Sequence, residues 1–173
     1  MGGAKIVVVA NVNGILSCLY LCAGDTRSWT IPGGGMEAKD ENQEACAIRE
    51  LEEEAGMRGR IEHLGEMSFL HVYEGDPKTY QSPRQPDPHD TSRYTRPHGP
   101  QREINPNAFE HIDDVWAPLE QDPSEYIRDN SRNPPRGRCS GEWNRFVRPY
   151  IDQIKQRVPH LVSEQYTLKA RLL

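Results

Sequence analysis

Residues 29–57 read WTIPGGGMEAKDENQEACAIRELEEEAGM, and this stretch carries the strongest structural signal in the chain. The three consecutive glycines at 33–35 predict a sharp turn whose backbone can approach a ligand closely, because glycine has no side chain in the way. The charged residues that follow predict a helix from about Ala38 to Ala55, with Gly56 as its stop. The stretch therefore predicts a glycine turn that leads into a helix.

The predicted helix has two different faces. Positions i, i+3 and i+4 lie on one side of a helix, so Glu50, Glu53 and Glu54 form a carboxylate cluster. The other side is apolar and can pack on a core. Its residues are Ile48, Leu51 and Ala55.

Clustered carboxylates repel one another, and a divalent cation removes that repulsion. Oxygen ligands favour Mg²⁺ or Mn²⁺, and Mg²⁺ usually shares its remaining positions with water and substrate phosphates. The cluster therefore predicts a magnesium or manganese site that acts on phosphates. A solvated, glutamate-rich helix is the simpler alternative. That alternative explains neither the glycines nor Arg49.

The spacing of these residues resembles the complete signature of the Nudix hydrolases. The matching positions are Gly35, Glu41, Arg49, Glu50, Leu51, Glu53, Glu54, Gly56 and Met57. The resemblance implies the α/β class, as an α/β/α sandwich with a mixed β-sheet between helices. It also implies an enzyme that hydrolyses a phosphoanhydride bond by attack of water, with Mg²⁺ or Mn²⁺ as the cofactor.

The resemblance further implies a role for each residue of the site. Glu50 and Glu54 match the family's principal metal-binding glutamates, and Glu53 matches a glutamate that binds metal or activates water. The carbonyl of Gly34 matches a backbone metal ligand, and Arg49 matches the arginine that holds a catalytic glutamate in place.

Two further acidic features follow from the same resemblance. Glu41 matches a position that we interpret as structural, since an acid is favourable near a helix N-terminus. The family often adds an acid from outside the signature. The candidates for that acid are Glu74, Glu103, Glu110, Asp113 and Asp114.

The form of the signature is similar to the diphosphoinositol polyphosphate phosphohydrolases, which also cleave diadenosine polyphosphates. Gly35 and the following Met36-Glu37 are the distinctive part, and the similarity covers residues 29–65. Residues 22–28 and a proline-rich insertion at 75–107 depart from that subfamily. The residues expected to contact substrate are Arg27, Gly33, Gly34, Gly35 and Glu37.

Other substrates and one other class of function stay open. Within the family, the alternatives are a nucleoside triphosphate or a nucleotide sugar of the ADP-ribose type. RNA cap removal uses the same chemistry, although the chain shows no aromatic and basic RNA-binding patch. Outside catalysis, the alternative is a silent module that binds a phosphorylated ligand or a protein. The intact Arg49, Glu50, Glu53 and Glu54 argue against that module.

Length and charge agree with a small-molecule enzyme. The 173 residues, 35% of them hydrophobic, predict one domain spanning 1–173. The net charge of −5 indicates no general attraction to nucleic acid or anionic lipid, so we expect a small phosphorylated substrate as the partner. Six arginines between 128 and 148 can bind its phosphates, or they can be solvated loop residues.

The cysteines and the N-terminal stretch predict a cytoplasmic protein. The four cysteines lack the spacing of a zinc site, and we expect reduced, buried thiols. Only five consecutive apolar residues, at 6–10, occur near the start, which is too few for a signal peptide or a membrane span.

The remaining pattern predicts a strand-rich chain. Residues 6–10 and 15–22 predict a hairpin around Asn13-Gly14. A short strand is expected at 29–31, a strand, bend and strand at 60–73, and a last strand within 108–119. Residues 121–139 are expected to form a loop, and the apolar spacing predicts a C-terminal helix at about 142–158.

Overall fold

Two long strands, β1 (Gly3–Val12) and β2 (Ile15–Ala23), form the centre of the fold. The computed structural model describes residues 2–83 and 111–162. Asn13 and Gly14 join the two strands with φ values of 53° and 87°. Two successive positive φ values are what a two-residue type I′ turn requires, so the predicted hairpin is confirmed.

Away from this turn, β1 and β2 separate and take new partners. The end of β2 pairs with β3 (Trp29–Thr30), and the start of β1 pairs with β4 (Gly33–Gly35). The outer edges of β1 and β2 are already occupied by β6 and β7, so residues 29–35 run between the separated ends. The prediction of a glycine turn was therefore wrong, because backbone pairing with β1 makes the glycines a short strand.

Three more strands complete a seven-stranded sheet with both parallel and antiparallel pairs. β5 (Glu62–Gly65) and β6 (Ser68–Val72) form the predicted strand, bend and strand, and β6 lies parallel to β1. β7 (His111–Pro118) lies antiparallel to β2. The mixed sheet is confirmed.

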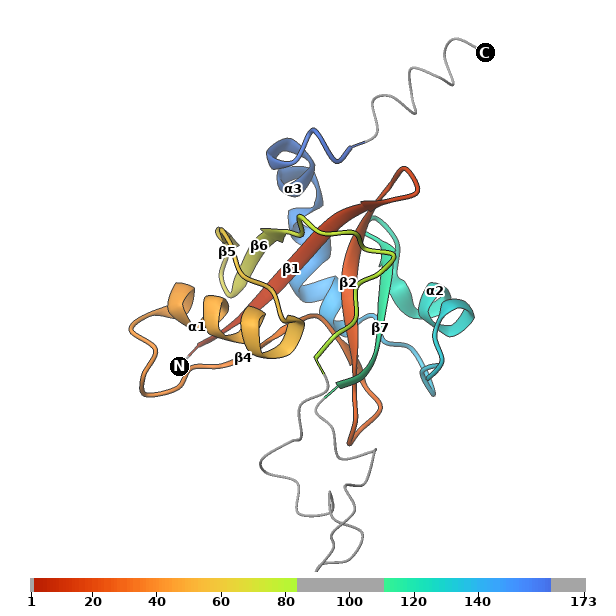
Figure 1. Cartoon of the computed structure of the whole chain (residues 1–173), viewed down its shortest axis with the longest axis horizontal. Helices are drawn as coiled ribbons and strands as arrows, with labels where there is room; N and C mark the ends of the chain where they lie inside the picture. The colour runs from red at the N-terminus through yellow and green to blue at the C-terminus, as the bar shows by residue number, and fades with distance from the viewer. Residues whose placement is uncertain (1, 84–110, 163–173) are drawn as a thin grey trace, which may run out of the picture.

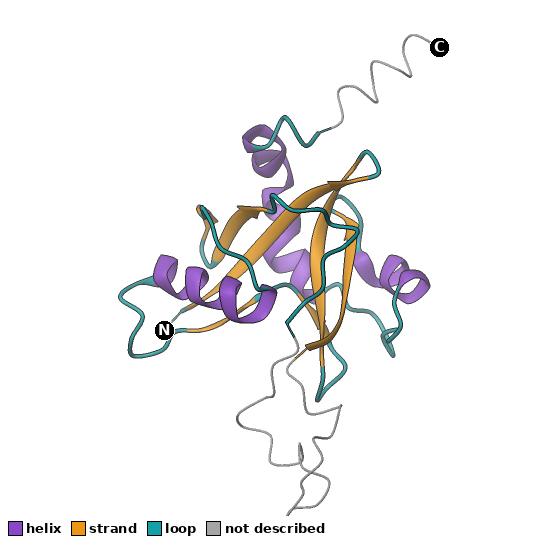
Figure 2. Cartoon of the chain, in the orientation of Figure 1, coloured by secondary structure: helices purple, strands orange, loops and turns teal. Residues whose placement is uncertain are grey.

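Helices cover both faces of this sheet, as Figures 1 and 2 show. Ile6 and Val8 of β1 point into a core shared with Leu51. Their neighbours Val7 and Val9 point into the opposite core. The strand alternation thus builds two cores, one on each face, which confirms the α/β/α arrangement. The helical segments are α1 (Gln43–Glu50), η1 (Leu51–Ala55), α2 (Pro123–Asn130), η4 (Trp143–Val147), η5 (Arg148–Tyr150) and α3 (Ile151–Arg157).

The helix predicted from residue 38 begins five residues later. Asn42 caps it, because its Oδ1 accepts a hydrogen bond from the Ala45 amide at 2.8 Å. The prediction that Ile48 packs on the core was also wrong, since 48% of Ile48 is exposed. The helix instead buries Cys46 and Ala47, and Ile48 lies roughly 100° further round the helix than Ala47.

Two further helical predictions need correction. The segment predicted as a loop over 121–139 contains α2, whose first turn is capped by Asp122 and includes Pro123. These are local helix-start signals that the prediction overlooked. The helix predicted over 142–158 is divided into η4, η5 and α3. Pro149 lies at the break, because proline lacks an amide hydrogen and clashes with the preceding turn.

Some predictions lie beyond the described residues. Most of the predicted 75–107 insertion does so, and its described part ends at residue 83. Within residues 2–83 and 111–162, none of the helices is long and apolar enough to cross a membrane.

Candidate active site

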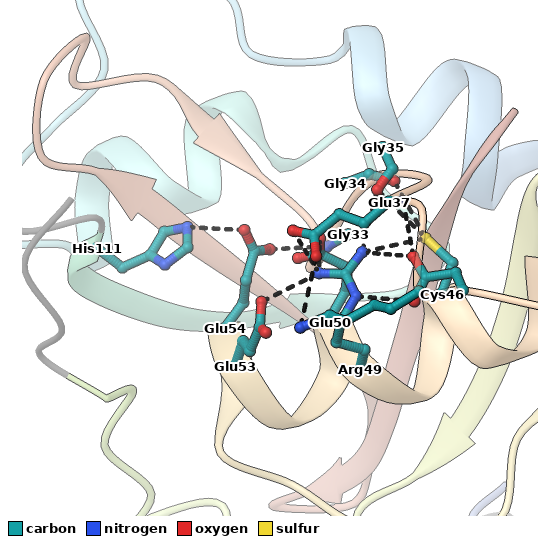
Figure 3. A network of polar contacts seen from close by, with 12 residues as sticks. Gly33, Gly34, Gly35, Glu37, Cys46, Arg49, Glu50, Glu53, Glu54 and His111 are labelled. Atoms are coloured by element: carbon teal, nitrogen blue, oxygen red, sulfur yellow. Dashed lines mark hydrogen bonds and ion pairs between the residues drawn. The ribbon is translucent and has the colours of Figure 1, made fainter. Parts of the chain in front are cut away.

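The three glutamates of the predicted cluster lie where α1 passes into η1, next to β4 (Figure 3). Glu50 is the last residue of α1, whereas Glu53 and Glu54 belong to η1, which is a π-helical turn. A π turn is wider than an α turn, and such turns occur frequently at functional sites. The regular 100° spacing assumed from the sequence therefore does not hold across this junction.

Arg49 links most of the residues that the sequence singled out. Its Nη1 donates to Oε1 of Glu50 at 2.8 Å and to Oε2 of Glu53 at 3.1 Å. The same nitrogen forms an ion pair with Glu37 at 3.4 Å, and Nη2 donates to the carbonyl of Gly35 at 3.1 Å. One guanidinium group thus connects the glycine strand, the loop after it and two carboxylates of the cluster.

Asp40 holds Arg49 in place, and the sequence interpretation missed it. Arg49 donates from Nε to Oδ1 at 3.0 Å and from Nη2 to Oδ2 at 2.8 Å, which is a two-bond fork. Only 3% of the Asp40 side chain is exposed. The hydrogen bonds from Arg49, together with the Glu37 amide, lower the pKa of Asp40 to about 2.

The Asp40 carboxylate also changes the pKa of Arg49. Its hydrogen bonds raise the pKa of the Arg49 guanidinium above its already high ordinary value. The signature places an acid at Glu41, the next residue, and Glu41 is exposed. The signal that could have identified Asp40 is therefore only its position beside a signature residue.

Glu50 is packed against the backbone of Gly34. A Cβ atom at Gly34 would lie 2.5 Å from Oε1 of Glu50, so only glycine leaves room for this carboxylate. Glu50 is buried, and this burial raises its pKa. The Gly34 carbonyl accepts a long hydrogen bond from Sγ of buried Cys46 at 3.6 Å.

Glu54 contacts two elements other than its own helix. Its Oε1 accepts a hydrogen bond from the Gly33 amide at 2.8 Å. Its Oε2 lies 3.9 Å from Nε2 of His111, the first residue of β7, as Figure 3 shows. His111 is buried, and nothing in the local sequence pattern identified it as a neighbour of the cluster.

The donor atoms of this site suit a hard divalent cation. The carboxylates of Glu50, Glu53 and Glu54 and the carbonyl of Gly34 supply oxygen only, which is the ligand type of Mg²⁺ and Mn²⁺. In the described part of the chain, no three His, Cys, Asp or Glu side chains converge on one point as metal ligands. Arg49 instead bridges Glu50 and Glu53, so it balances their charge.

Arg27, predicted to contact substrate, lies apart from the hydrogen bonds of the cluster. Its Nη1 donates to Oδ1 of Asn133 at 2.7 Å, and it lines a separate cavity of about 330 Å³. The other predicted contacts, Glu37 and the three glycines, lie around Arg49, Glu50 and Glu54.

Three of the five candidate acids from outside the signature lie among the described residues. Asp113 is buried and accepts hydrogen bonds from the amides of Arg132 and Asn133, while Asp114 accepts one from Ser82. Glu74 is exposed on another cavity, lined also by His71. Both aspartates therefore accept hydrogen bonds from residues in loops. The two remaining candidates, Glu103 and Glu110, lie outside the described residues.

A family model described as the NUDIX domain matches residues 3–134 of this chain. This range contains the whole carboxylate cluster together with Arg49, Asp40 and His111. No curated protein matches the sequence.

Several solved structures are similar in fold. The NUDIX domain of Shewanella oneidensis NrtR, complexed with ADP ribose, has 15% identity and a TM-score of 0.49, with 91% of this chain and 88% of that chain covered. The Ap4A hydrolase of C. elegans has 16% identity and a TM-score of 0.42, with 99% and 98% covered. A MutT/nudix family protein from Enterococcus faecalis has 17% identity and a TM-score of 0.44, with 69% of this chain and 44% of that chain covered. Likeness at these identities concerns the fold alone.

Proposed function

The chain belongs to the Nudix hydrolase family, and from this premise we propose that it cleaves a phosphoanhydride bond in a substrate carrying several phosphates. The preferred substrates are diphosphoinositol polyphosphates or dinucleoside polyphosphates, with Mg²⁺ or Mn²⁺ as the cofactor. The form of the signature around Gly35, Met36 and Glu37 supports this choice of substrate.

One observation carries the proposed catalysis: Arg49 fixes the carboxylates of Glu50 and Glu53 with a single nitrogen. A binding module has no need of an arginine placed between two carboxylates. We assign the holding of the cation to Glu50, Glu54 and the carbonyl of Gly34. When bound, the cation supplies positive charge that stabilises the phosphoryl oxygens during the reaction.

We assign the activation of the attacking water to Glu53. Its side chain is 44% exposed, whereas that of Glu50 is 11% exposed, so water reaches Glu53 more easily. Arg49 bonds Oε2 of Glu53 and leaves the other oxygen to accept a proton. The water oxygen then bonds to phosphorus as the bridging P–O bond breaks, and the leaving phosphate carries away the electron pair.

The test compares Glu53→Gln with Glu52→Gln, a change in the same turn at an exposed residue that pairs only with Arg58 among the described residues. We expect Glu53→Gln to lower kcat by about 100-fold or more, as loss of a general base does. Glu52→Gln should keep the activity of the unaltered protein. Phosphate release with Mg²⁺ and circular dichroism of both variants provide the measurements.

A panel of substrates tests the proposed choice of substrate. It contains a diphosphoinositol polyphosphate, diadenosine tetraphosphate, ADP-ribose and nucleoside triphosphates. Faster turnover of nucleoside triphosphates or ADP-ribose would show that the preferred substrate is wrong. Absence of metal-dependent turnover on every diphosphate would favour the binding module instead.

A further inference from the structure

The segment that follows β6, residues 74–83, crosses the face of the sheet that η1 covers (Figure 1). Tyr80 of this crossing segment packs against the core on that face, to which Leu51 of η1 also belongs. Further along, the Ser82 amide donates to Oδ2 of Asp114, a residue of β7, at 2.9 Å. The crossing segment therefore runs from the end of β6, past η1, to β7.

The crossing segment contacts the C-terminal end of η1 at two points. Oη of Tyr80 donates a hydrogen bond to the carbonyl of Ala55, the last residue of η1, at 2.7 Å. A Cβ atom at Gly56 would lie 2.9 Å from Cγ of Pro83, so the proline packs closely against the residue that ends the turn. Both contacts come from residues outside the Nudix signature.

The hydrogen bond to Ala55 supplies what the helix cannot supply itself. The last carbonyls of a helix have no amide partner within the regular helical pattern. At the end of η1, the Gly56 amide bonds back to the carbonyl of Glu52 at 3.0 Å. The carbonyl of Ala55 lies beyond that bond and accepts from the Tyr80 hydroxyl. One side-chain hydroxyl thus ties the end of the turn to the crossing segment.

Two other aromatic rings hold the ring of Tyr80 in place. It lies edge-on to Tyr73, with the ring centroids 5.5 Å apart, and edge-on to Trp116 at 5.8 Å. Tyr73 and Trp116 stack on each other at 5.6 Å, and such pairs have preferred geometries. Trp116 belongs to β7, and the Tyr73 amide donates to the carbonyl of Val9 in β1 at 3.0 Å. The sheet therefore fixes the ring that presents the hydroxyl to η1.

The residues just before Ala55 are two acids of the candidate active site. Glu53 and Glu54 lie in the same five-residue turn, and Oε1 of Glu54 accepts from the Gly33 amide at 2.8 Å. A shift of the end of the turn moves both carboxylates, and a misplacement of about 1 Å lowers a rate by about 100-fold. We propose that Tyr80 is a positioning residue, whose hydroxyl fixes the end of η1 and with it these two carboxylates. This inference rests on the proposed function for the roles of the two acids.

The kinetic test compares Tyr80→Phe with Tyr73→Phe. Each change removes one hydroxyl from the same aromatic cluster and keeps the ring, but the Tyr73 hydroxyl forms no hydrogen bond with another described residue. Tyr80→Phe should lower kcat about tenfold and leave KM unchanged, because outer contacts of a metal site have effects of at least about that size. Tyr73→Phe should keep both values. Phosphate release from diadenosine tetraphosphate with saturating Mg²⁺ is the measurement. An equal fall of kcat in both variants, or a change in KM alone, would overturn the positioning role.

Amide hydrogen exchange separates this inference from the hydrolysis proposal, since it needs neither metal nor substrate. The amides of Gly56 and Met57 report on the end of η1, because they bond back to carbonyls of that turn at 3.0 and 3.3 Å. In Tyr80→Phe both should exchange about fivefold faster, the size expected from losing one hydrogen bond, and in Tyr73→Phe neither should change. We expect this result even if the unaltered protein shows no turnover, in which case only the proposed function fails. Unchanged exchange at both amides, or an equal increase at residues 7–9 of β1, would overturn the inference.

Discussion

At the scale of single residues, Gly34 and Gly35 provide a sharp comparison. A Cβ at Gly34 would lie 2.5 Å from Glu50 Oε1, whereas a Cβ at Gly35 would meet nothing within 4 Å. We expect Gly34→Ala to displace Glu50 and lower kcat by about 100-fold, since small misplacements of catalytic groups have effects of that size. Gly35→Ala should stay near the kcat of the unaltered protein. Similar losses in both variants would mean that glycine is needed for backbone flexibility and not for room beside Glu50.

We expect a substitution of Asp40 to lower activity more than a substitution of Glu41, the neighbouring residue that belongs to the signature. Asp40→Asn removes the charge of the fork to Arg49, so Arg49 should hold Glu50 and Glu53 less well. Losses from such outer contacts are about 10- to 100-fold in activity or metal affinity. We expect kcat to fall and the required Mg²⁺ concentration to rise in Asp40→Asn, measured by phosphate release across a Mg²⁺ titration.

Glu41→Gln is the control for this prediction, because Glu41 is exposed and lies next to Asp40. It should keep both kcat and the Mg²⁺ requirement. A larger effect from Glu41→Gln than from Asp40→Asn would contradict the positioning role of Asp40.

The lowered pKa of Asp40 also predicts how stability depends on pH. Its pKa falls from an ordinary 3.8 to about 2 in the folded protein. The ionised form is therefore favoured by folding, and its contribution is fully present above pH 3.8 and is lost as the pH falls through about 2. Urea unfolding should show that the difference between the unaltered protein and Asp40→Asn shrinks over this range. A difference independent of pH would contradict it.

At the scale of elements, the start of α1 depends on its cap. Asn42→Ala removes the hydrogen bond to the Ala45 amide and should lower the free energy of unfolding by about 1 kcal/mol. For a chain of this size, Tm should fall by roughly 2–4 °C. Thermal melts followed by circular dichroism measure the change. Asn42→Ser keeps an acceptor and should melt near the unaltered protein; if it melts as low as Asn42→Ala, the cap is not the cause.

Elements with local signals were predictable, and those made by distant partners were not. The hairpin at Asn13-Gly14 follows from two residues that favour positive φ. The glycine strand β4 exists because residues 33–35 pair with Gly3–Lys5 of β1, about thirty positions earlier in the chain. The local spacing of residues 51–55 predicts an ordinary α-helix and does not indicate the π turn η1. α2 is different, because the local sequence contains its start signals, the cap Asp122 and Pro123 in the first turn.

At the scale of the whole molecule, one ion pair joins residues from opposite ends of the described chain. Lys5 of β1 and Glu142, just before η4, are 2.7 Å apart, and both side chains are 19% exposed. Glu142 also accepts from Ile31 beside the glycine strand. The pair therefore holds the start of the C-terminal helical segments against β1 and against the residues that lead into the glycine strand.

Breaking this pair should destabilise the protein measurably. Lys5→Met leaves a largely buried carboxylate without its cation and should lower the free energy of unfolding by about 2 kcal/mol, reduced from fully buried cases because some solvent reaches it. Lys155→Met is the control, since its pair with Glu120 is more exposed, at 37% and 59%. It should change stability by less than about 0.5 kcal/mol. Equal urea midpoints for both variants would contradict this role.

The sequence by itself determined the family, the α/β class and the reaction class, because the signature is a set of spacings within one continuous stretch, from Gly35 to Met57. Only the tertiary structure decided which groups surround those glutamates. His111 beside Glu54, Lys5 beside Glu142 and Asn133 beside Arg27 each join residues at least 57 positions apart. Such contacts depend on the order and register of the strands, which pairing of distant backbone segments sets and no local spacing encodes.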